Sequence, residues 1–484
     1  ENYTQEQVDR MVRCVAWAAG NPKTFQEICW MGVDEAGAGD RNGRYGKRHK
    51  ILGVLRDALR QKSVGAIETI PDSTMPQMMH RLMSSAMVAK PAGVITSLIP
   101  MTNPELTPIV TAIYALKARD VVVFSPHPRT VKTTNKVVQV MRDALASIGE
   151  NPDFLQCVSE VNMDLVAETM KRCDLIMATG GPAMTKAAHS SGKPAYCSGA
   201  GNATMIYDET AIPAEAARNT RISKTSDFGS GCSADGNIII SDAIYDETVK
   251  ALIAEGGYLA TDEERALLKK AMWDEEGHRI VATVAVSPQE LCRKAGFEIP
   301  EDRKFVMVNS EGIGKEFKFS GEKLTTLLTI YKYEGEFENA LKMMDEKIPP
   351  VLTVYKAKDF KDAYRILVEL TNLVGRGHSC GIYSFDEDHI QRLALRAPVT
   401  RVMVRQPQSK ANAGSAENGM PMTSSMGCGT WGGNQVSENI ALKHYMNSTW
   451  VARPIMKDQP SEDVLFGEFY DGSVTREQGE VIKF

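Results

Sequence analysis

Short apolar segments alternate with amphipathic segments between residues 93 and 178, and this alternation limits the fold more than any other feature of the chain. Apolar runs of strand length lie at 93–99, 120–124, 154–158 and 174–178. Patterns with helical spacing fill the intervals, at 108–118, 130–148 and 162–171. Such alternation predicts an α/β fold, with a parallel sheet covered by helices on both faces and a ligand at the carboxyl ends of its strands.

The rest of the chain gives weaker local signals. Further strands are expected at 305–308, 351–354 and 401–404, and a helix at 359–373. A capping box at Thr4 predicts an amphipathic helix that ends near Gly20. Residues 33–48 are rich in Gly, Arg and Asp, which is typical of a loop, and a new helical pattern starts near Arg48.

Composition narrows the class of protein. A chain of 484 residues is long for one core, so two large domains are expected. The net charge is −5 with the charges interspersed, which argues against a nucleic-acid partner. Nine scattered cysteines without metal-ligand spacing favour a reducing, cytoplasmic compartment and no metal site. No apolar run reaches membrane-spanning length, so no membrane association is expected.

Cys232 follows a Gly-rich turn and precedes the β-branched run Ile238-Ile239-Ile240. Gly229 and Gly231 allow a sharp turn, so the thiol would project from a constrained loop whose N–H groups could face an oxyanion. This arrangement suits a nucleophile. The alternative is an inert buried cysteine, the commoner state of an intracellular Cys.

A nicotinamide or other dinucleotide site has no standard signature here. No G-x-G-x-x-G follows any of the expected strands. Thr179-Gly180-Gly181-Pro182 stands at a strand-to-helix junction, where helix-terminal N–H groups could hold a phosphate. A purely structural turn is the alternative for this segment.

Several separated motifs resemble the CoA-acylating branch of the aldehyde dehydrogenase superfamily, from about Val88 to Pro454. They are Lys224-Thr225-x-Asp227-x-Gly229-x-x-Cys232, Pro100-Met101-Thr102-Asn103-Pro104, Gly375-Arg376-Gly377-His378-Ser379 and Met426-Gly427-Cys428-Gly429-Thr430-Trp431-Gly432-Gly433-Asn434. The resemblance implies a variant Rossmann cofactor domain, which explains the missing fingerprint, plus an α/β catalytic domain and a small oligomerisation element. It places the cofactor domain at 1–227 with the oligomerisation element near 70–90, the catalytic domain at 228–430, and a C-terminal return and oligomerisation tail at 431–484.

The same resemblance assigns roles to individual residues. Cys232 is the nucleophile, and the Asn103 amide helps to hold the oxyanion. NAD or NADP would be bound by residues that include Ser125, His127, Pro128, Arg129, Thr179, Gly180, Gly181 and Glu322. Arg129 could meet a 2′-phosphate through its guanidinium fork or could face solvent. Thr326 departs from the proline usual after the Glu322 segment.

Ser198 is the residue that indicates acylation. By the spacing of the family it occupies the position of the glutamate that activates water in hydrolytic aldehyde dehydrogenases. A serine cannot replace a carboxylate as a base near neutral pH, so the thioester is expected to await coenzyme A. His378 could take a proton from a thiol or could be structural. Cys428 is a second thiol that family position assigns to packing.

Substrate charge is inferred from cations that depart from the usual branch pattern. Arg405, Lys410 and Arg376 suit an anionic aldehyde, although they could instead meet coenzyme A phosphates or water. The chain is most similar to members of the branch that act on sulfoacetaldehyde, with succinate semialdehyde second and propanal third. A homodimer or homotetramer is expected, and a catalytically silent protein with this fold remains the alternative of a different class.

Overall fold

The computed structural model describes residues 2–70, 85–180, 182–198, 201, 203–235, 237–277, 279–309, 318–320, 325–330, 353–357, 367–368, 371, 375–452 and 460–473. The chain divides into two compact units, Glu1–Ser63 with Lys90–Asn447 and Val64–Ala89 with Ser448–Phe484. The larger unit holds two parallel sheets, and their strand ends position the candidate site.

In the described residues, five parallel strands form the first sheet, in the order β5-β4-β3-β6-β7. They are β3 (Val94–Leu98), β4 (Val121–Ser125), β5 (Leu155–Cys157), β6 (Leu175–Thr179) and β7 (Ala195–Ser198). The chain builds outward from β3 in both directions, first to β4 and β5 and then to β6 and β7. The topological switch point therefore lies between β3 and β6, where open α/β sheets bind ligands at the carboxyl ends of their strands.

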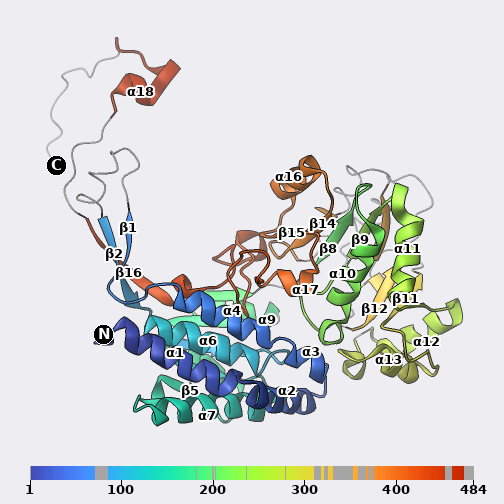
Figure 1. Ribbon diagram of the computed structural model, residues 1–484, viewed down its shortest axis with the longest axis horizontal. Coiled ribbons are helices and arrows are strands. Elements are labelled where there is room, and N and C mark those ends of the chain that lie inside the picture. The colour runs from blue at the N-terminus through green and yellow to red at the C-terminus, as the bar shows by residue number, and fades with distance from the viewer. Residues whose placement is uncertain are drawn as a thin grey trace. The chain divides into compact units, whose positions relative to one another are not determined.

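Helices connect and cover these strands. They are α6 (Leu106–Ala118), α7 (Val131–Ser147), α8 (Met163–Arg172) and α9 (Pro182–His189). Helix α6 is buried along its whole length, because α1 (Gln5–Gly20) and α4 (Arg48–Leu59) pack against it. Figure 1 shows α1, α6 and α7 side by side, in agreement with their contacts. The capping box that begins α1 is confirmed by the reciprocal bonds of Thr4 and Gln7.

The predicted loop at residues 33–48 is wrong over most of its length. Helix α2 (Pro22–Ala36) continues into it and ends at Gly37, whose φ of 61° is the left-handed value that favours glycine. Helix α3 (Arg41–Tyr45) follows, capped by the Asp40 carboxylate. Glycine at position 43 lowers helix propensity but does not prevent this short helix, since the Asp40 cap satisfies two of its N–H groups.

Eight parallel strands of the described chain form the second sheet, in the order β10-β11-β12-β13-β9-β8-β14-β15. They are β8 (Thr204–Tyr207), β9 (Asn237–Ser241), β10 (Gly257–Leu259), β11 (Phe305–Asn309), β12 (Leu327–Ile330), β13 (Thr353–Ala357), β14 (Cys380–Tyr383) and β15 (Val402–Val404). Ile238, Ile239 and Ile240 are fully buried in β9, as an uninterrupted apolar run in a covered parallel sheet predicts. Strand β8 belongs to this sheet although it precedes residue 227, where the first domain was predicted to end.

The helices that accompany this sheet are α10 (Pro213–Thr225), α11 (Tyr245–Ala254), α12 (Asp262–Met272), α13 (Pro288–Ala295), α16 (Glu387–Arg396) and α17 (Gln408–Ala411). The strands predicted in both halves of the chain are confirmed wherever they fall on described residues. Most of the helix predicted at 359–373 lies outside them. Within the described residues, no helix combines the length and the apolar composition that crossing a membrane requires.

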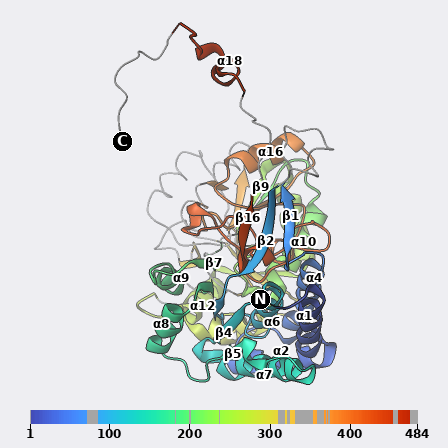
Figure 2. The same ribbon diagram turned by 90° about the vertical axis from the view of Figure 1, so that its left-hand side faces the viewer.

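The smaller unit is built around a separate three-stranded sheet. Its strands β1 (Ala66–Ile70), β2 (Ser85–Pro91) and β16 (Met446–Val451) lie side by side in Figure 2, in the order β1-β2-β16. A short helix, α18 (Glu462–Phe466), follows toward the C-terminus. Residues 71–84 of the predicted oligomerisation element lie outside the described part of the chain, so that role stays a prediction.

Candidate active site

The Cys232 thiol lies in the loop that leads from α10 into β9. Among the nine cysteines, all within the described residues, Cys232 alone is exposed. The others are buried or half-buried, and burial raises the pKa of Cys157 and Cys292 to about 12. The burial that the alternative of an inert cysteine requires is therefore wrong for position 232, and the nucleophilic role of Cys232 stays a prediction.

The turn ahead of Cys232 has an unusual backbone. Asp227, Phe228 and Gly229 all adopt positive φ values, 49°, 50° and 72°. A Cβ atom at Gly229 would lie 2.7 Å from the Thr325 carbonyl oxygen, so a larger residue would force the turn apart. Strained backbone of this kind persists only where the surrounding structure holds it, and such segments cluster at functional sites.

Gly201 brings the Ser198 segment against the thiol loop. A Cβ atom at Gly201 would lie 2.0 Å from the Cys232 carbonyl oxygen, so the two backbones are in direct contact. Ser198 ends β7, is buried, and its Oγ accepts a hydrogen bond from the Met426 N–H at 3.1 Å. Ser198 occupies the position at which the resemblance to the family expects a general base. That position therefore holds a buried hydroxyl that is hydrogen-bonded to a backbone N–H.

Asn103 lies in the loop after β3, at the switch point of the first sheet. Its Oδ1 accepts a hydrogen bond from the Lys47 ammonium at 2.8 Å, and its Nδ2 donates to the Thr102 hydroxyl at 3.3 Å. An amide nitrogen carries two hydrogens, and the second has no partner among the described residues. Because an ammonium only donates, Lys47 fixes which end of the amide faces it and leaves Nδ2 for a ligand.

Lys47 also ties Asn103 to the turn before the thiol. Its ammonium contacts the Asp227 carboxylate at 2.8 Å, and Arg44 lies 3.4 Å from the same carboxylate. Burial alone would raise the pKa of Asp227, but Lys47 and Arg44 outweigh it and the pKa falls to about 2. Asp227 is thus an anion at neutral pH and joins the N-terminal helices to the thiol loop.

Arg44 and Glu105 complete this buried ionic group. Both are almost entirely inaccessible, and the Arg44 Nη1 lies 3.7 Å from the Glu105 carboxylate. Burial raises the pKa of Glu105, while Arg44 and Lys47 act in the opposite sense. The group links α3, the start of α6 and the turn at Asp227, so the Asn103 loop and the thiol loop share one set of charges.

Lys410 brings further positive charge to the same turn, and Lys50 lies within electrostatic reach of Lys47, Lys410 and Cys232. The Lys410 ammonium donates to the Ser226 hydroxyl at 3.0 Å. Burial and the neighbouring Lys47 lower the pKa of Lys410, against the effect of Asp227. Lys410 was predicted from the sequence, whereas Lys47 and Lys50 were missed within the predicted loop and the helix after it. Five Lys and Arg residues in positions 41–50 were the available signal.

His378 is buried just before β14. Its Nδ1 lies 2.8 Å from the Ser379 hydroxyl, and its Nε2 has no hydrogen-bond partner in the described residues. Burial, with a smaller effect of Arg401, lowers the pKa of His378 to about 3. The imidazole is therefore neutral near pH 7 and is a weak base there.

The other two predicted cations are not brought to the thiol. Arg405 follows β15 at the carboxyl end of the second sheet, whereas Cys232 precedes β9 at the amino end. The Arg405 guanidinium instead stacks on the Phe385 ring, 3.9 Å from its centroid. Placing Arg405 beside the thiol was wrong, because the parallel strands separate the two residues. Arg376 is exposed at the amino end of β14, without a described contact to Cys232.

The predicted cofactor residues gather at the carboxyl ends of β4 and β6. Ser125 ends β4 and is buried, and His127 and Pro128 follow it at a short 3₁₀ turn. Thr179 ends β6, and its hydroxyl lies 2.8 Å from that of Ser425. Gly180 leaves a space that a Cβ atom would fill, at 3.3 Å from Met184. This arrangement beside the switch point fits a nucleotide.

Arg129 is exposed, and its guanidinium donates to the Ala36 carbonyl. Gly181 and Glu322 lie outside the described residues.

Cys428 is buried, with its N–H bonded to the Asn434 side chain at 2.9 Å. Its burial is that of a packing residue, as family position predicts.

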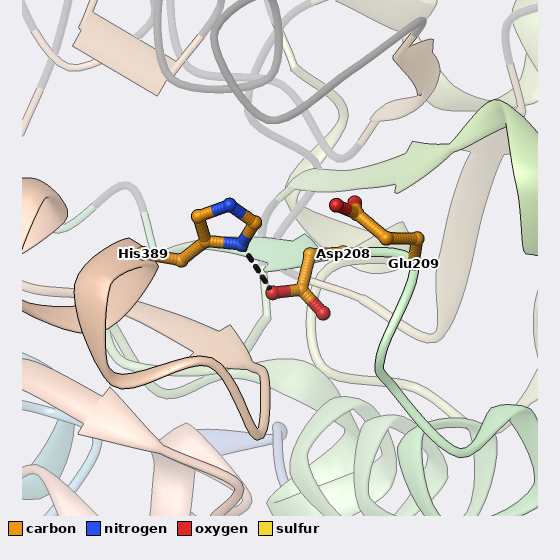
Figure 3. Close-up of side chains that lie close together, drawn as sticks. All are labelled: Asp208, Glu209 and His389. Atoms are coloured by element: carbon orange, nitrogen blue, oxygen red, sulfur yellow. Dashed lines mark hydrogen bonds and ion pairs between the residues drawn. The ribbon is translucent and has the colours of Figure 1, made fainter.

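One group of potential metal ligands lies at the carboxyl end of β8, in Asp208, Glu209 and His389. Figure 3 draws a single contact in it, from the His389 Nδ1 to the Asp208 carboxylate at 2.9 Å. Asp208 also accepts a hydrogen bond from the Thr210 hydroxyl at 2.6 Å. These bonds fasten the start of α16 to the end of β8 and account for the closeness of His389 and Asp208.

Comparison with known proteins gives a consistent set of matches. Residues 22–265 match the sequence model of the aldehyde dehydrogenase family. The chain is 37% identical to a sulfoacetaldehyde dehydrogenase of an Acholeplasma species, over 97% of this chain and 91% of that one. It is 38% identical to an acylating sulfoacetaldehyde dehydrogenase of Bilophila wadsworthia, over 97% and 95%. An acetylating aldehyde dehydrogenase from Geobacillus thermoglucosidasius is similar in structure, with a TM-score of 0.83, 29% identity and coverage of 95% and 94%.

Proposed function

The chain belongs to the aldehyde dehydrogenase family, and from that premise we propose that it is a CoA-acylating enzyme whose preferred substrate is sulfoacetaldehyde. The observation that carries the acylating part is Ser198, a buried hydroxyl in the segment that packs on the Cys232 loop. The names of the two relatives above support the choice of aldehyde. Succinate semialdehyde is the second candidate and propanal the third.

In the first step the Cys232 thiolate adds to the aldehyde carbon. A C–S bond forms, and the carbonyl π electrons move to oxygen as an oxyanion. The free hydrogen of Asn103 Nδ2 and the Cys232 N–H would stabilise this charge, with Lys47 holding the amide in the required orientation. Donors that are held in place before reaction lose no energy in reorganisation as the charge develops.

A bound nicotinamide cofactor would accept the hydride of the adduct. Ser125, His127, Thr179 and Gly180 are the described residues that would hold it, at the carboxyl ends of β4 and β6. Arg129 would favour NADP if its exposed guanidinium exchanged the hydrogen bond to the Ala36 carbonyl for one to the 2′-phosphate of the cofactor. The proposal therefore covers either nicotinamide.

Loss of the hydride leaves an acyl group on Cys232 as a thioester. The thiolate of coenzyme A then attacks the carbonyl, and the Cys232 thiolate leaves. Water could do the same only with a base to remove its proton, and the Ser198 hydroxyl cannot act as one near neutral pH. The Ser198 segment therefore favours transfer to the thiol over hydrolysis. His378, with its pKa of about 3, has no proton-accepting role in this proposal.

The test compares NAD(P)H formation from sulfoacetaldehyde with and without coenzyme A, and identifies the product by mass spectrometry. We expect steady turnover only with coenzyme A and an acyl-CoA product. Ser198→Glu should raise the ratio of acid to acyl-CoA at least about tenfold, since a general base contributes 10²–10⁴ in rate, whereas Ser198→Ala should not. Sulfoacetate formed without coenzyme A would identify a hydrolytic enzyme. Inactivity on all three aldehydes would favour the alternative of a catalytically silent protein with this fold.

The expected location and assembly belong to the same proposal. None of the nine cysteines forms a disulfide, as suits a reducing cytoplasm. A homodimer or homotetramer is the proposed state. Light scattering of the purified protein would give its mass, and a mass near 53.2 kDa, that of one chain, would contradict it.

A further inference from the structure

Three lysines, which we call the lysine cluster, lie within electrostatic reach of one another near the turn that precedes the thiol: Lys47, Lys50 and Lys410. Lys410 bonds to the Ser226 hydroxyl, and Lys47 to the Asp227 carboxylate. Lys50 lies three residues after Lys47 at the start of α4, and residues three apart share a face of a helix. Lys47 and Lys410 therefore bring the start of α4 and α17 together at Ser226 and Asp227.

The lysine cluster carries more positive charge than its partners neutralise. Asp227 is already shared between Lys47 and Arg44. Within the described part of the chain, neither Lys50 nor Lys410 forms an ion pair. Lys50 is half-buried, and burial, followed by Lys47 and Lys410, lowers its pKa to about 8. Half-buried cations without counter-ions are costly, and a bound anion would relieve that cost.

The surplus charge lies beside the reacting atom. Cys232 is six residues beyond Ser226, and its thiolate raises the pKa of Lys50, so the two groups are within electrostatic reach. Asn103, the proposed oxyanion donor, is bonded to Lys47. A substrate held at the thiol would therefore carry its substituents into the same region as the cluster.

We propose that Lys50 and Lys410 bind the sulfonate group of the aldehyde while Lys47 holds Asn103 against its carbonyl. This inference rests on the proposed function, because it assigns the anionic substrate of that reaction to named residues. In sulfoacetaldehyde the sulfonate is one carbon away from the carbonyl. One short substrate can thus contact the thiol and the cluster together.

The type of cation favours this ligand over others of the same charge. Lysine is a compact point charge with three rotatable donors, which suits the three oxygens of a tetrahedral sulfonate. A planar carboxylate is better matched by the bidentate fork of arginine. Arg44, which shares the Asp227 carboxylate with Lys47, is buried against Asp227 and Glu105 and is not available.

The test measures kcat/KM for sulfoacetaldehyde and for propanal in Lys50→Met and Lys410→Met. Each substitution should lower the ratio of the two values at least about tenfold, mainly through the KM for sulfoacetaldehyde, because each removes a charge-assisted hydrogen bond. Lys50→Arg should recover part of the loss. Lys270→Met, at an exposed position of α12, is the matched control and should change neither substrate.

A rise in the KM for coenzyme A, with no change in the ratio of kcat/KM for sulfoacetaldehyde to that for propanal, would overturn the inference. It would assign the lysine cluster to the phosphates of coenzyme A. An equal loss on both aldehydes would overturn it as well. If a variant does not fold, wild-type enzyme provides the test: ethanesulfonate should compete with sulfoacetaldehyde at lower concentration than propanoate does, and equal inhibition by both contradicts the inference. A wild-type preference for propanal would instead contradict the proposed function itself.

Discussion

The two ends of the parallel strands in the second sheet differ in how their charges are balanced. At the carboxyl end, Asp208 accepts hydrogen bonds from His389 and Thr210, and Arg405 stacks on Phe385. At the amino end, the exposed Cys232 lies beside lysines that outnumber their acidic partners. The difference shows that charge density alone does not mark a site. A site is marked by charges that the protein leaves without internal partners.

The largest effect should follow from removing the one exposed thiol at the amino end. Cys232→Ala should lower aldehyde oxidation by about 10⁴-fold or more, because loss of a nucleophile removes the covalent route. Nicotinamide binding, followed by fluorescence titration, should persist. More than about a hundredth of the wild-type rate in the variant would exclude Cys232 as the nucleophile.

A smaller effect should follow from uncoupling Asn103 from the charges around it. Lys47→Met should lower kcat about 10- to 100-fold with propanal, a substrate without a sulfonate, since removing an oxyanion donor outright costs 10²–10³. KM should change little. The loss arises because nothing then fixes the orientation of the Asn103 amide.

The matched experiment for Lys47 is a double-mutant cycle. In an Asn103→Ala background, Lys47→Met should cost almost nothing further, because its effect passes through the amide. Additive losses would show that Lys47 acts independently, for example through the stability of Asp227. Circular dichroism of each variant would confirm that the comparison is made on folded protein.

The two histidines extend the comparison to pH. His389 is paired with Asp208, whereas buried His378 has a pKa of about 3, below its ordinary value of 6.5. The stability that comes from keeping His378 neutral in the folded state is fully present above pH 6.5 and is lost as the pH falls toward 3. The reason is that the histidine of the unfolded chain binds a proton at a higher pH than that of the folded chain. Between pH 6.5 and 3 the free energy of unfolding therefore falls by about 1.4 kcal/mol per pH unit.

His378→Gln should therefore show a shallower fall in unfolding free energy than the wild type between pH 6.5 and 5. Denaturant unfolding at a series of pH values measures it. Parallel curves for the two proteins would mean that His378 is protonated in the folded state and would reopen its role as a base.

Much of the fold could be predicted because its signals are local. Strand β9 is an uninterrupted apolar run and α1 begins with a capping box, so periodicity and capping were enough. The first sheet was predictable because short apolar segments alternate with amphipathic segments along its part of the chain. Helix α3 was missed because its glycine suggests a loop, while its cap and its packing against the Asp227 turn depend on tertiary structure.

The site was predictable only where a motif names the residue. Cys232, Asn103 and Lys410 fell in motifs or beside them. Lys47 contacts the Asp227 turn, and Lys50 lies within electrostatic reach of Cys232, from a segment nearly two hundred residues away in sequence, so no local spacing could indicate them. Arg405 was misplaced for the converse reason: nearness to a strand end in sequence does not say which end of the parallel sheet the thiol occupies.

The smallest effect should come from Arg405, and it tests the comparison directly. Arg405→Ala removes a cation from the carboxyl end, where its guanidinium stacks on an exposed Phe385. Because the length of the parallel strands separates it from Cys232, kcat/KM should change by less than about twofold for both sulfoacetaldehyde and propanal, as is usual for surface substitutions. Comparing kcat/KM in Arg405→Ala with that in Lys410→Met distinguishes the roles of two cations that lie five positions apart in sequence. A loss confined to sulfoacetaldehyde in Arg405→Ala would mean that the substrate anion reaches the carboxyl end and that the lysine cluster serves another ligand.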